Sequence, residues 1–320
     1  MGERMYFYQL YGMVVKSNIE FPQLLVNTES RDDYDVFIEV FSCSNNYEKK
    51  SDPLTEGVDF GNTESGLWFR NQAGRFTIET KGDKSHMKCE KYSDVHISIV
   101  RSFFLGNCLA ILLTQRHKIV LHGSTLVSGK ETFIICGDSG SGKSTLSMAL
   151  LDRGTELMAD DISVIDINTE TGECLAYPGF PEQKLCRDAA VKEGYDLETL
   201  RYVNEDRDKF SIDRNNVFIS TPRKVTKLFV LYKIKKENAN LPRYIDGFRS
   251  EEIIGADKVN TITDCFFLRQ LYGNMLSLSP DDMLKCVVLA GQIRMFDMVR
   301  IDGVDSLNGL LDYVSGHLEE

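Results

Sequence analysis

A glycine-rich stretch at residues 134–145, with the sequence IICGDSGSGKST, constrains the fold of this chain more than any other segment. It contains the spacing G-x-x-x-x-G-K-[ST], which is completed by Gly137, Gly142, Lys143 and Ser144. A short β-branched segment at 132–136 precedes the glycines, and a helical pattern begins near Lys143. A strand, a loop and a helix in this order are typical of a phosphate-binding loop rather than of an accidental glycine-rich turn.

Such a loop binds the phosphates of a nucleoside triphosphate. Its glycines let successive backbone N–H groups face one anion, and the lysine reaches the β- and γ-phosphates. The Ser144 hydroxyl can join the coordination sphere of Mg²⁺. The sequence therefore predicts that the chain uses ATP and Mg²⁺. The residues expected to contact them are Gly137, Asp138, Ser139, Gly140, Ser141, Gly142, Lys143, Ser144 and Thr145.

Two adjacent aspartates, Asp160 and Asp161, follow the loop at the end of a short apolar segment. Phosphoryl transfer beside a phosphate loop needs one carboxylate to hold Mg²⁺, usually through water, and another to orient or deprotonate the attacking hydroxyl. Adjacent aspartates could supply both functions. The alternative is a solvated acidic turn. The position of the two aspartates relative to the phosphate loop makes the catalytic interpretation the stronger one.

Four further residues are candidates for the same site. His122 lies in a strand that should bring it to the face of the phosphate loop, where it could contact a phosphate or orient an aspartate. An ordinary hydrogen-bonded histidine is an equal alternative. Positive charge near the γ-phosphate would neutralise the transition state, and a solvated surface position is the default for each basic side chain. The basic candidates are Lys184, Arg187 and Lys209.

Composition limits the possible partners. The 320 residues predict two domains or one large one, and 42% hydrophobic with 27% charged residues is ordinary for a soluble protein. The balance of 37 basic against 48 acidic residues, a net charge of −11, argues against nucleic acid or an anionic membrane as partner. We expect a peptide or small-protein substrate with an acceptor serine, and a homo-oligomer is possible.

Targeting signals and the cysteine pattern bear on where the protein is located. The first residues contain no signal peptide pattern, and the longest apolar run, 103–113, is expected to be far too short to span a membrane. The eight cysteines include no C-x-x-C pair, so buried reduced thiols are expected rather than zinc or redox chemistry. Together these features predict a cytoplasmic protein.

The chain is predicted to have a β-rich N-terminal domain at 1–93 and a nucleotide-binding domain at 94–320. Short strands separated by turn residues predict an antiparallel meander at 5–15, 35–43, 66–70, 75–80 and 87–92. A helical apolar stripe begins at Val95, and Gly154 should cap the helix after the loop. Further strands are expected at 119–127, 132–136, 162–167, 224–234 and 295–301, and helices at 261–275, 281–293 and 305–317.

Three motifs in order resemble the catalytic domain of HPr serine kinase/phosphorylase, a family related in fold to phosphoenolpyruvate carboxykinase. They are His122-Gly123, the loop at 137–144 and Asp160-Asp161, and they cover roughly residues 118–170. The resemblance implies an α/β (α+β) fold with a mixed, largely antiparallel sheet. It also implies that Lys143, His122 and both aspartates are catalytic, that Asp161 is favoured as the base without excluding Asp160, and that Ser144 and one aspartate, taken as Asp160, bind the metal.

The positions at which this sequence departs from HPr kinases indicate which branch of the family it resembles. Thr145 stands where HPr kinases have an acidic residue, and their downstream Arg-Gly-Leu-Gly signature is not found. The segments 6–22 and 178–185 are instead similar to HPr-kinase-like proteins encoded with lasso peptide clusters, which phosphorylate the C-terminal serine of a precursor peptide. This resemblance predicts a peptide serine kinase. The alternatives are a bifunctional HPr kinase/phosphorylase, a related small-molecule kinase, or a nucleotide-gated binding protein that transfers no phosphate.

Overall fold

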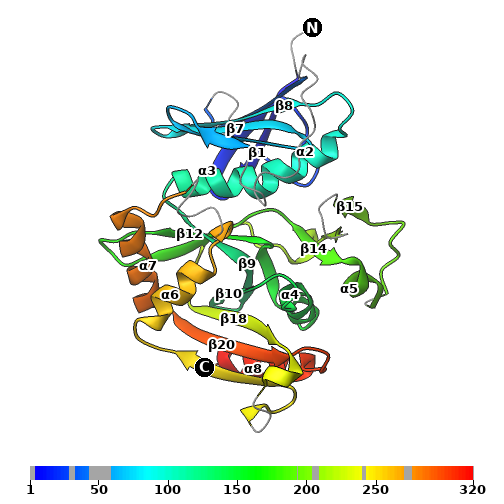
Figure 1. The fold of residues 1–320 in the computed structure, drawn as a ribbon, viewed down its shortest axis with the longest axis vertical. Coiled ribbons are helices and arrows are strands. Elements are labelled where there is room, and N and C mark those ends of the chain that lie inside the picture. Colours follow the sequence, from blue (N-terminus) through cyan, green and yellow to red (C-terminus); the bar gives the residue numbers. More distant parts are fainter. Residues whose placement is uncertain are drawn as a thin grey trace.

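The computed structural model describes residues 4–28, 33–42, 59–192, 194–203, 209–239, 243–269 and 276–319. They form a mixed α/β fold with two large mixed sheets and a small third sheet (Figure 1). The first sheet lies at the N-terminal end of the molecule, a long helix lies beneath it, and the second sheet lies beyond that helix. The predicted boundary between residues 93 and 94 falls in the turn before this helix.

Eight strands build the first sheet, in the order β3-β1-β2-β4-β8-β7-β6-β5. They are β1 (Tyr6–Leu10), β2 (Met13–Ser17), β3 (Leu25–Val26), β4 (Val36–Ser42), β5 (Phe60–Asn62), β6 (Gly66–Asn71), β7 (Gly74–Lys81) and β8 (Lys84–Lys91). Buried and half-buried residues alternate along β2, β6 and β7. One face of this sheet is therefore packed against the protein interior.

Two predictions for this sheet are wrong in part. The stretch 5–15 is not one strand, because the chain reverses at Tyr11 and Gly12 to form the β1–β2 hairpin. The sheet is not a simple antiparallel meander either, because β4 runs parallel to both β2 and β8. Alternation along a strand indicates which face is buried but not the direction of its neighbours. The predicted strand end at Cys43 lies outside the described residues.

The second large sheet has the order β17-β13-β12-β9-β10-β18-β20-β19, with β11 also paired to β9. Its strands are β9 (Ile119–Ser128), β10 (Glu131–Gly137), β11 (Glu156–Ala159), β12 (Ile162–Ile167), β13 (Cys174–Tyr177), β17 (Arg223–Lys224), β18 (Lys227–Ile234), β19 (Phe248–Ile253) and β20 (Arg294–Ile301). The β10–β18 and β18–β20 pairs are parallel, and the other pairs are antiparallel. The prediction of a mixed sheet is thus confirmed.

A small sheet and several helices complete the fold. The small sheet, in the order β14-β16-β15, contains β14 (Glu182–Cys186), β15 (Arg201–Val203) and β16 (Lys209–Asp213). The helices after the phosphate loop are α4 (Lys143–Asp152), α5 (Arg187–Lys192), α6 (Asp257–Asp264), α7 (Pro280–Gln292) and α8 (Leu307–Leu318), with short 3₁₀ turns η2 (Asn215–Val217) and η3 (Lys236–Asn238). Gly154, with a φ of 97°, follows the C-cap of α4, as predicted.

The predicted helix at 261–275 is wrong in its bounds, because α6 ends at Asp264. The apolar residues that follow it leave the helix and run beside β9. The N–H of Phe267 donates to the carbonyl of Val120, and the N–H of His122 donates to the carbonyl of Cys265. Backbone hydrogen bonds to β9 replace helical hydrogen bonds in this segment. Residues 270–275 of the predicted helix lie outside the described residues.

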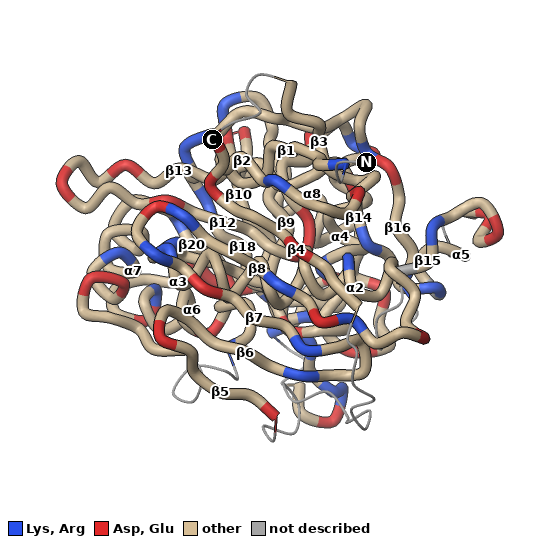
Figure 2. The backbone as a smooth tube through the Cα atoms, turned by 90° about the horizontal axis from the view of Figure 1, so that it is seen from above, with Lys and Arg blue, Asp and Glu red and all other residues tan. Residues whose placement is uncertain are grey.

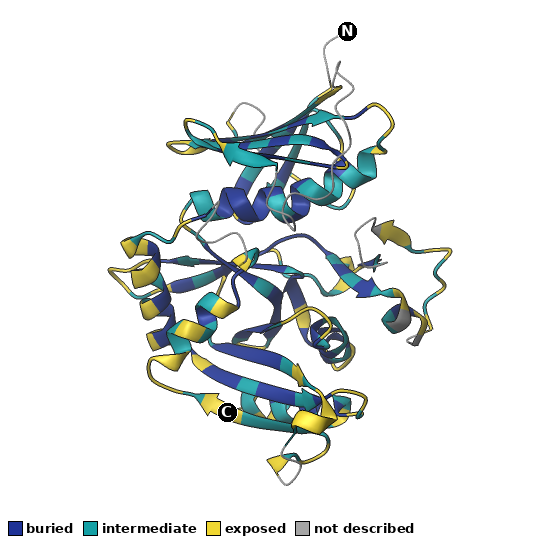
Figure 3. Ribbon diagram, viewed as in Figure 1, coloured by how far each residue is buried: buried dark blue, intermediate teal, exposed yellow. Residues whose placement is uncertain are grey.

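One continuous helix separates the two large sheets. It consists of α2 (Ile97–Phe103), a π-helical turn η1 (Phe104–Cys108) and α3 (Leu109–Gln115). The apolar run at 103–113 is part of this longer segment, so the prediction that it is far too short for a membrane span is wrong: by length and composition alone the helix could cross a membrane. However, 56% of its most apolar window is buried in the protein. Figure 3 shows this burial between the two sheets.

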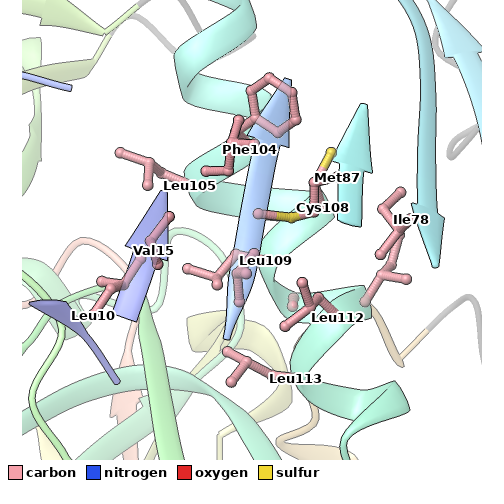
Figure 4. Packing of buried hydrophobic residues seen from close by; sticks show 14 of the residues in the cluster. Leu10, Val15, Ile78, Met87, Phe104, Leu105, Cys108, Leu109, Leu112 and Leu113 are labelled. Atoms are coloured by element: carbon pink, nitrogen blue, oxygen red, sulfur yellow. The ribbon is translucent and has the colours of Figure 1, made fainter. Parts of the chain in front are cut away.

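A single hydrophobic cluster joins the two large sheets through this helix. Figure 4 shows Leu10 and Val15 of the first sheet in the same cluster as Leu105 and Leu109 of the helix. The same cluster includes Val120 of β9 and Ile162 of β12. Because apolar burial stabilises in proportion to the area removed from water, each sheet contributes to the stability of the other.

The remaining sequence features agree with an ordinary protein surface and interior. Acidic and basic residues are interspersed along the chain (Figure 2). The described cysteines are unpaired, and all of them except the half-buried Cys186 are buried. Burial raises the pKa of the Cys108 and Cys136 thiols well above their ordinary value. These thiols are therefore protonated, as the sequence predicted.

Candidate active site

The phosphate loop lies between the end of β10 and the start of α4. Three of its glycines, Gly137, Gly140 and Gly142, have positive φ angles. At Gly137 a side chain has no room, because a Cβ there would lie 2.1 Å from the carbonyl oxygen of Leu231 on β18. Gly142 is the N-cap of α4, so the unpaired N–H groups and the positive end of the helix dipole face the loop. This backbone has the shape and polarity of a phosphate-binding site.

Lys143 is held inside the loop and is only 9% exposed. Its Nζ donates to the carbonyl oxygens of Gly137 and Asp138 at 2.5 and 3.0 Å. Burial lowers the pKa of Lys143, while the carboxylate of Asp161 acts in the opposite direction. The ammonium is thus fixed by two loop carbonyls and feels the charge of the downstream acidic pair.

Arg300 of β20 also contacts the loop, although no sequence motif singles it out. Its Nε donates to the carbonyl oxygen of Ser141 at 2.5 Å, and its Nη2 lies 3.4 Å from that of Gly140. Hydrogen bonds from a guanidinium are strong, so these contacts restrict the loop backbone. Within the described residues, the buried Ser141 hydroxyl has no hydrogen-bond partner, which fits a loop that binds a ligand oxygen.

The two aspartates occupy a tight turn between β11 and β12. Asp161 has a φ of 68°, and the N–H of Ile162 donates to the carbonyl of Asp160 at 2.8 Å, which closes a three-residue turn. A non-glycine residue in this conformation is strained, and such strain is common at functional sites. Ile162 pairs with His122 of β9, and the next strand, β10, leads into the phosphate loop. The turn and the loop are therefore positioned by neighbouring strands.

Asp160 is buried, and both of its oxygens accept hydrogen bonds. The Ser124 hydroxyl donates to Oδ1 at 2.6 Å, and the N–H of Lys184 donates to Oδ2 at 2.8 Å. Burial raises the pKa of Asp160, and the negative charge of Asp161 adds to this effect. A nearby cation would offset both causes.

Asp161 lies among three basic side chains. Its Oδ1 is 3.4 Å from Nε2 of His122 and 3.9 Å from Nζ of Lys209, and its Oδ2 is 3.1 Å from Nζ of Lys184. Burial opposes ionisation of Asp161, but Lys184 and Lys209 outweigh it and lower the pKa of the carboxyl well below its ordinary value. Asp161 is therefore ionised throughout the neutral range.

The small sheet brings two of the three basic candidates to Asp161. Lys184, in the middle of β14, and Lys209, at the start of β16, each form an ion pair with Asp161. Arg187 is placed differently, with its guanidinium 5.0 Å from the ring centre of Phe210. The two lysines therefore place positive charge directly beside the Asp161 carboxylate.

The donor set fits Mg²⁺ only together with a nucleotide. The described residues contain no group of three or more His, Cys, Asp or Glu side chains that could hold a metal ion by themselves. Ser144 in the first turn of α4 and Asp160 offer hard oxygen ligands, which Mg²⁺ prefers, and Mg²⁺ commonly takes its remaining ligands from substrate phosphates and water. The buried Asp160, whose pKa is raised beside another carboxylate, is the position where a cation would be most stabilising.

Sequence reasoning missed Ser124 and Arg300. Ser124 could have been found, because it lies two residues after His122 in a predicted strand, and alternate residues share a face. The structure uses this face twice, with His122 at Asp161 and Ser124 at Asp160. No local pattern connects Arg300 to the loop, since their contact depends on the order of strands in the sheet.

Comparisons with known proteins add little to this geometry. No protein-family model matches the chain, and no curated protein matches it. Among solved structures the chain is similar to one described as the Hpr(Ser) kinase/phosphatase from Coxiella burnetii, with 17% sequence identity and a TM-score of 0.29. The match covers 62% of this chain and 93% of that one. The fold and the site by themselves define a protein with a phosphate loop, a mixed sheet and an acidic turn beside the loop.

Proposed function

We propose that the chain is an ATP- and Mg²⁺-dependent serine kinase that acts on a peptide. The observation that supports this most is the position of the Asp160–Asp161 turn next to the phosphate loop. The N–H of Gly123 donates to the carbonyl of Asp161, and Gly123 pairs with Cys136, the residue before the loop. Lys184 and Lys209 flank the turn. A loop alone would suit nucleotide binding. A buried, electrostatically coupled acid–base cluster beside it is what transfer to a hydroxyl requires.

Each residue has a role in this proposal. The loop amides and Lys143 bind the phosphates, while Ser144 and Asp160 would hold Mg²⁺, which supplies charge neutralisation between the phosphates. Asp161 accepts a hydrogen bond from the attacking serine hydroxyl and then its proton. Its position on a fixed turn keeps the carboxylate oriented, which matters more than its basicity in a loose phosphoryl-transfer transition state.

The proposed substrate is a lasso peptide precursor with a C-terminal serine. The sequence segments that resemble kinases of such precursors, 6–22 and 178–185, lie far apart in the chain. In the fold they are in contact, because the N–H of Tyr11 donates to the carbonyl of Pro178 at 2.9 Å. This contact beside the acidic turn supports the view that the parts of the two segments around Tyr11 and Pro178 form one functional unit.

The direct test is phosphorylation of synthetic peptides that end in serine. Incubation with ATP and Mg²⁺, followed by mass spectrometry, should show one or more added phosphoryl groups on the serine peptide and none on a matched peptide ending in alanine. Lys143→Met should reduce transfer by about 10²- to 10³-fold, because the phosphate charge then lacks its fixed cation. ATP binding without transfer to any peptide, protein or small hydroxyl compound would favour a nucleotide-gated binding protein instead.

A second assay separates the kinase from a bifunctional kinase/phosphorylase. The purified phosphopeptide is incubated with inorganic phosphate, and pyrophosphate is measured. No efficient release is expected, since the downstream signature of the bifunctional enzymes was not found. Rapid release of pyrophosphate would assign the chain to the bifunctional branch.

A further inference from the structure

The N-terminal sheet reaches the acidic turn with one side chain, Tyr11. This residue lies at the tip of the β1–β2 hairpin, where Tyr11 and Gly12 have φ angles of 48° and 77°. Two-residue hairpin loops of this handedness normally take Asn or Gly, and a positive φ is costly for an aromatic residue. A strained tyrosine at this position suggests that its side chain is needed where the hairpin places it.

The ring of Tyr11 is enclosed by residues of the second large sheet and its loops. A Cβ added to Gly179 would lie 2.8 Å from the Tyr11 hydroxyl, and a Cβ added to Gly12 would lie 2.6 Å from the ring of Tyr177. Tyr11 is only 5% exposed. The two glycines therefore allow a close fit between the hairpin tip and the loop after β13.

The Tyr11 hydroxyl donates to the carbonyl oxygen of Ile162 at 2.7 Å. The N–H of the same Ile162 closes the turn at Asp161 by donating to the carbonyl of Asp160. Burial, together with the charges of Asp161 and Asp160, raises the pKa of the Tyr11 hydroxyl far above its ordinary value, so the hydroxyl remains a donor. Ile162 is thus held on both sides, by the turn and by the N-terminal sheet.

We propose that Tyr11 is a positioning residue for phosphoryl transfer, acting through Ile162 to fix the direction of the Asp161 carboxylate. The proposal rests on the proposed kinase function. Tyr11 does not touch the reacting atoms, and its hydroxyl acts on the backbone that carries the base. A small misplacement of a catalytic group can reduce turnover strongly, so one hydrogen bond at this point matters for rate.

The test compares Tyr11→Phe with Tyr8→Phe. Tyr8 is a matched control because it lies on the same hairpin, is buried, and uses its hydroxyl to accept the N–H of Phe21 away from the acidic turn. Tyr11→Phe is expected to lower kcat by about 10- to 100-fold with the KM for ATP within about twofold. Tyr8→Phe should leave both constants near wild type. A kcat within twofold of wild type in folded Tyr11→Phe would overturn the proposal, and so would an equal loss in Tyr8→Phe.

A spectroscopic measurement judges Tyr11 without relying on the kinase reaction. His122 contacts Asp161, and its ring signals can be assigned in ¹⁵N NMR by their loss in His122→Gln. Tyr11→Phe should shift the His122 signals, whereas Tyr8→Phe should not. Unchanged His122 signals in Tyr11→Phe would overturn the positioning role. If wild type phosphorylates nothing but the shift occurs, the kinase proposal fails and the structural role of Tyr11 stands.

Gly179→Ala provides a second variant should Tyr11→Phe fail to fold. Its new Cβ would lie 2.8 Å from the Tyr11 hydroxyl, too close for both atoms to keep their places. The same loss of kcat and the same shift of the His122 signals are expected. A folded Gly179→Ala protein with wild-type turnover and wild-type His122 signals would contradict the proposal.

Discussion

At the scale of single residues, Asp160 and Asp161 are adjacent in sequence but have opposite surroundings. Asp160 is buried against neutral donors, whereas Asp161 faces Lys184, Lys209 and His122. The first has a raised pKa and the second a lowered one. Groups whose environments separate their pKa values usually have separate roles, which favours Asp160 beside the metal and Asp161 beside the acceptor hydroxyl.

Substitution of each aspartate should therefore give a different defect. Asp161→Asn is expected to lower kcat by about 10²- to 10⁴-fold with little change in the Mg²⁺ midpoint, because a general base is lost. Asp160→Asn should shift the Mg²⁺ midpoint upward, because a cation ligand is lost. Steady-state kinetics over a Mg²⁺ titration measures both. Exchanged defects would exchange the roles, and two near-normal variants would reduce the pair to a structural turn.

Lys184→Met tests the electrostatics of Asp161. The lowered pKa of Asp161 contributes stability at pH values above its unfolded pKa, and this contribution is lost as the pH falls through the folded pKa. Removing Lys184 raises the folded pKa, so the variant should lose roughly 1–3 kcal/mol of unfolding free energy at pH 7 and less at pH 3. Urea unfolding at both pH values measures the difference.

The matched control for this variant is Lys84→Met. Lys84 also pairs with an aspartate, at 2.6 Å, but that pair is exposed on the first sheet. Exposed ion pairs contribute little, so Lys84→Met should unfold nearly like wild type. If the destabilisation by Lys184→Met is equal at pH 7 and pH 3, the lysine does not act through the ionisation of Asp161.

Most candidate residues of the site were visible in the sequence because they belong to local motifs. The phosphate loop and the aspartate pair are each contiguous in sequence. The strands predicted next to them indicate where the chain must turn. Lys184 and Lys209 could be named only as candidates, since their approach to Asp161 depends on the small sheet. Tyr11 and Arg300 could not be found, because strands distant in sequence bring them to the turn and the loop.

At the scale of elements, the phosphate loop depends on how closely β10 and β18 approach each other. Gly137 has a φ of 144°, and a Cβ there would meet the backbone of β18, whereas Gly140 has a φ of 77° with open space around it. The two glycines thus differ in packing, although both have left-handed backbone conformations. Their substitution separates a packing requirement from a conformational one.

Gly137→Ala should therefore cost more than Gly140→Ala. The first adds overpacking to backbone strain, for a loss of roughly 2–5 kcal/mol, and the second adds strain alone, about 1–2 kcal/mol. Thermal unfolding measures both losses, and ATP binding should weaken more in Gly137→Ala. Equal losses in the two variants would mean that the contact with Leu231 can relax.

Element types were predicted better than element bounds and directions. Periodicity identified the helix before β9 and the strands around the loop, because these segments bury one face or one stripe. The end of α6 could not be predicted, since residues after Asp264 pair with β9 and tertiary contacts override local helical preference there. The parallel direction of β4 likewise depends on a distant neighbour, β8.

At the scale of the whole molecule, the helix at 97–115 is shared by both large sheets. Phe104 is fully buried and contacts the rings of Phe76 in β7 and of Phe21 in the loop between β2 and β3. The same cluster continues into β9 and β12. A shared interior of this kind favours cooperative unfolding of both sheets.

Phe104→Ala should destabilise the entire chain by about 3–5 kcal/mol without separating the transition into two steps. The single tryptophan, Trp68, lies in β6, so its fluorescence follows the first sheet, while far-UV circular dichroism follows all elements. The two signals should change together in wild type and variant. Phe41→Ala, at an exposed position of β4, is the control and should cost little. Two separate transitions would contradict a shared core.

The shared helix also has a consequence for inheritance. Consider a gene exchange near residue 93 that joins the first sheet of one protein to the helix and phosphate-loop half of a related protein. The apolar face of the sheet and the apolar helix would then come from two different sequences. Val120 and Ile162 pack in the same cluster as Leu10. An exchange that keeps the stability of the protein therefore requires core residues on both sides of residue 93 that fit each other. The first sheet and the phosphate-loop half are therefore expected to descend as a single recombination unit, and shuffled descendants that carry only one of them should be rare.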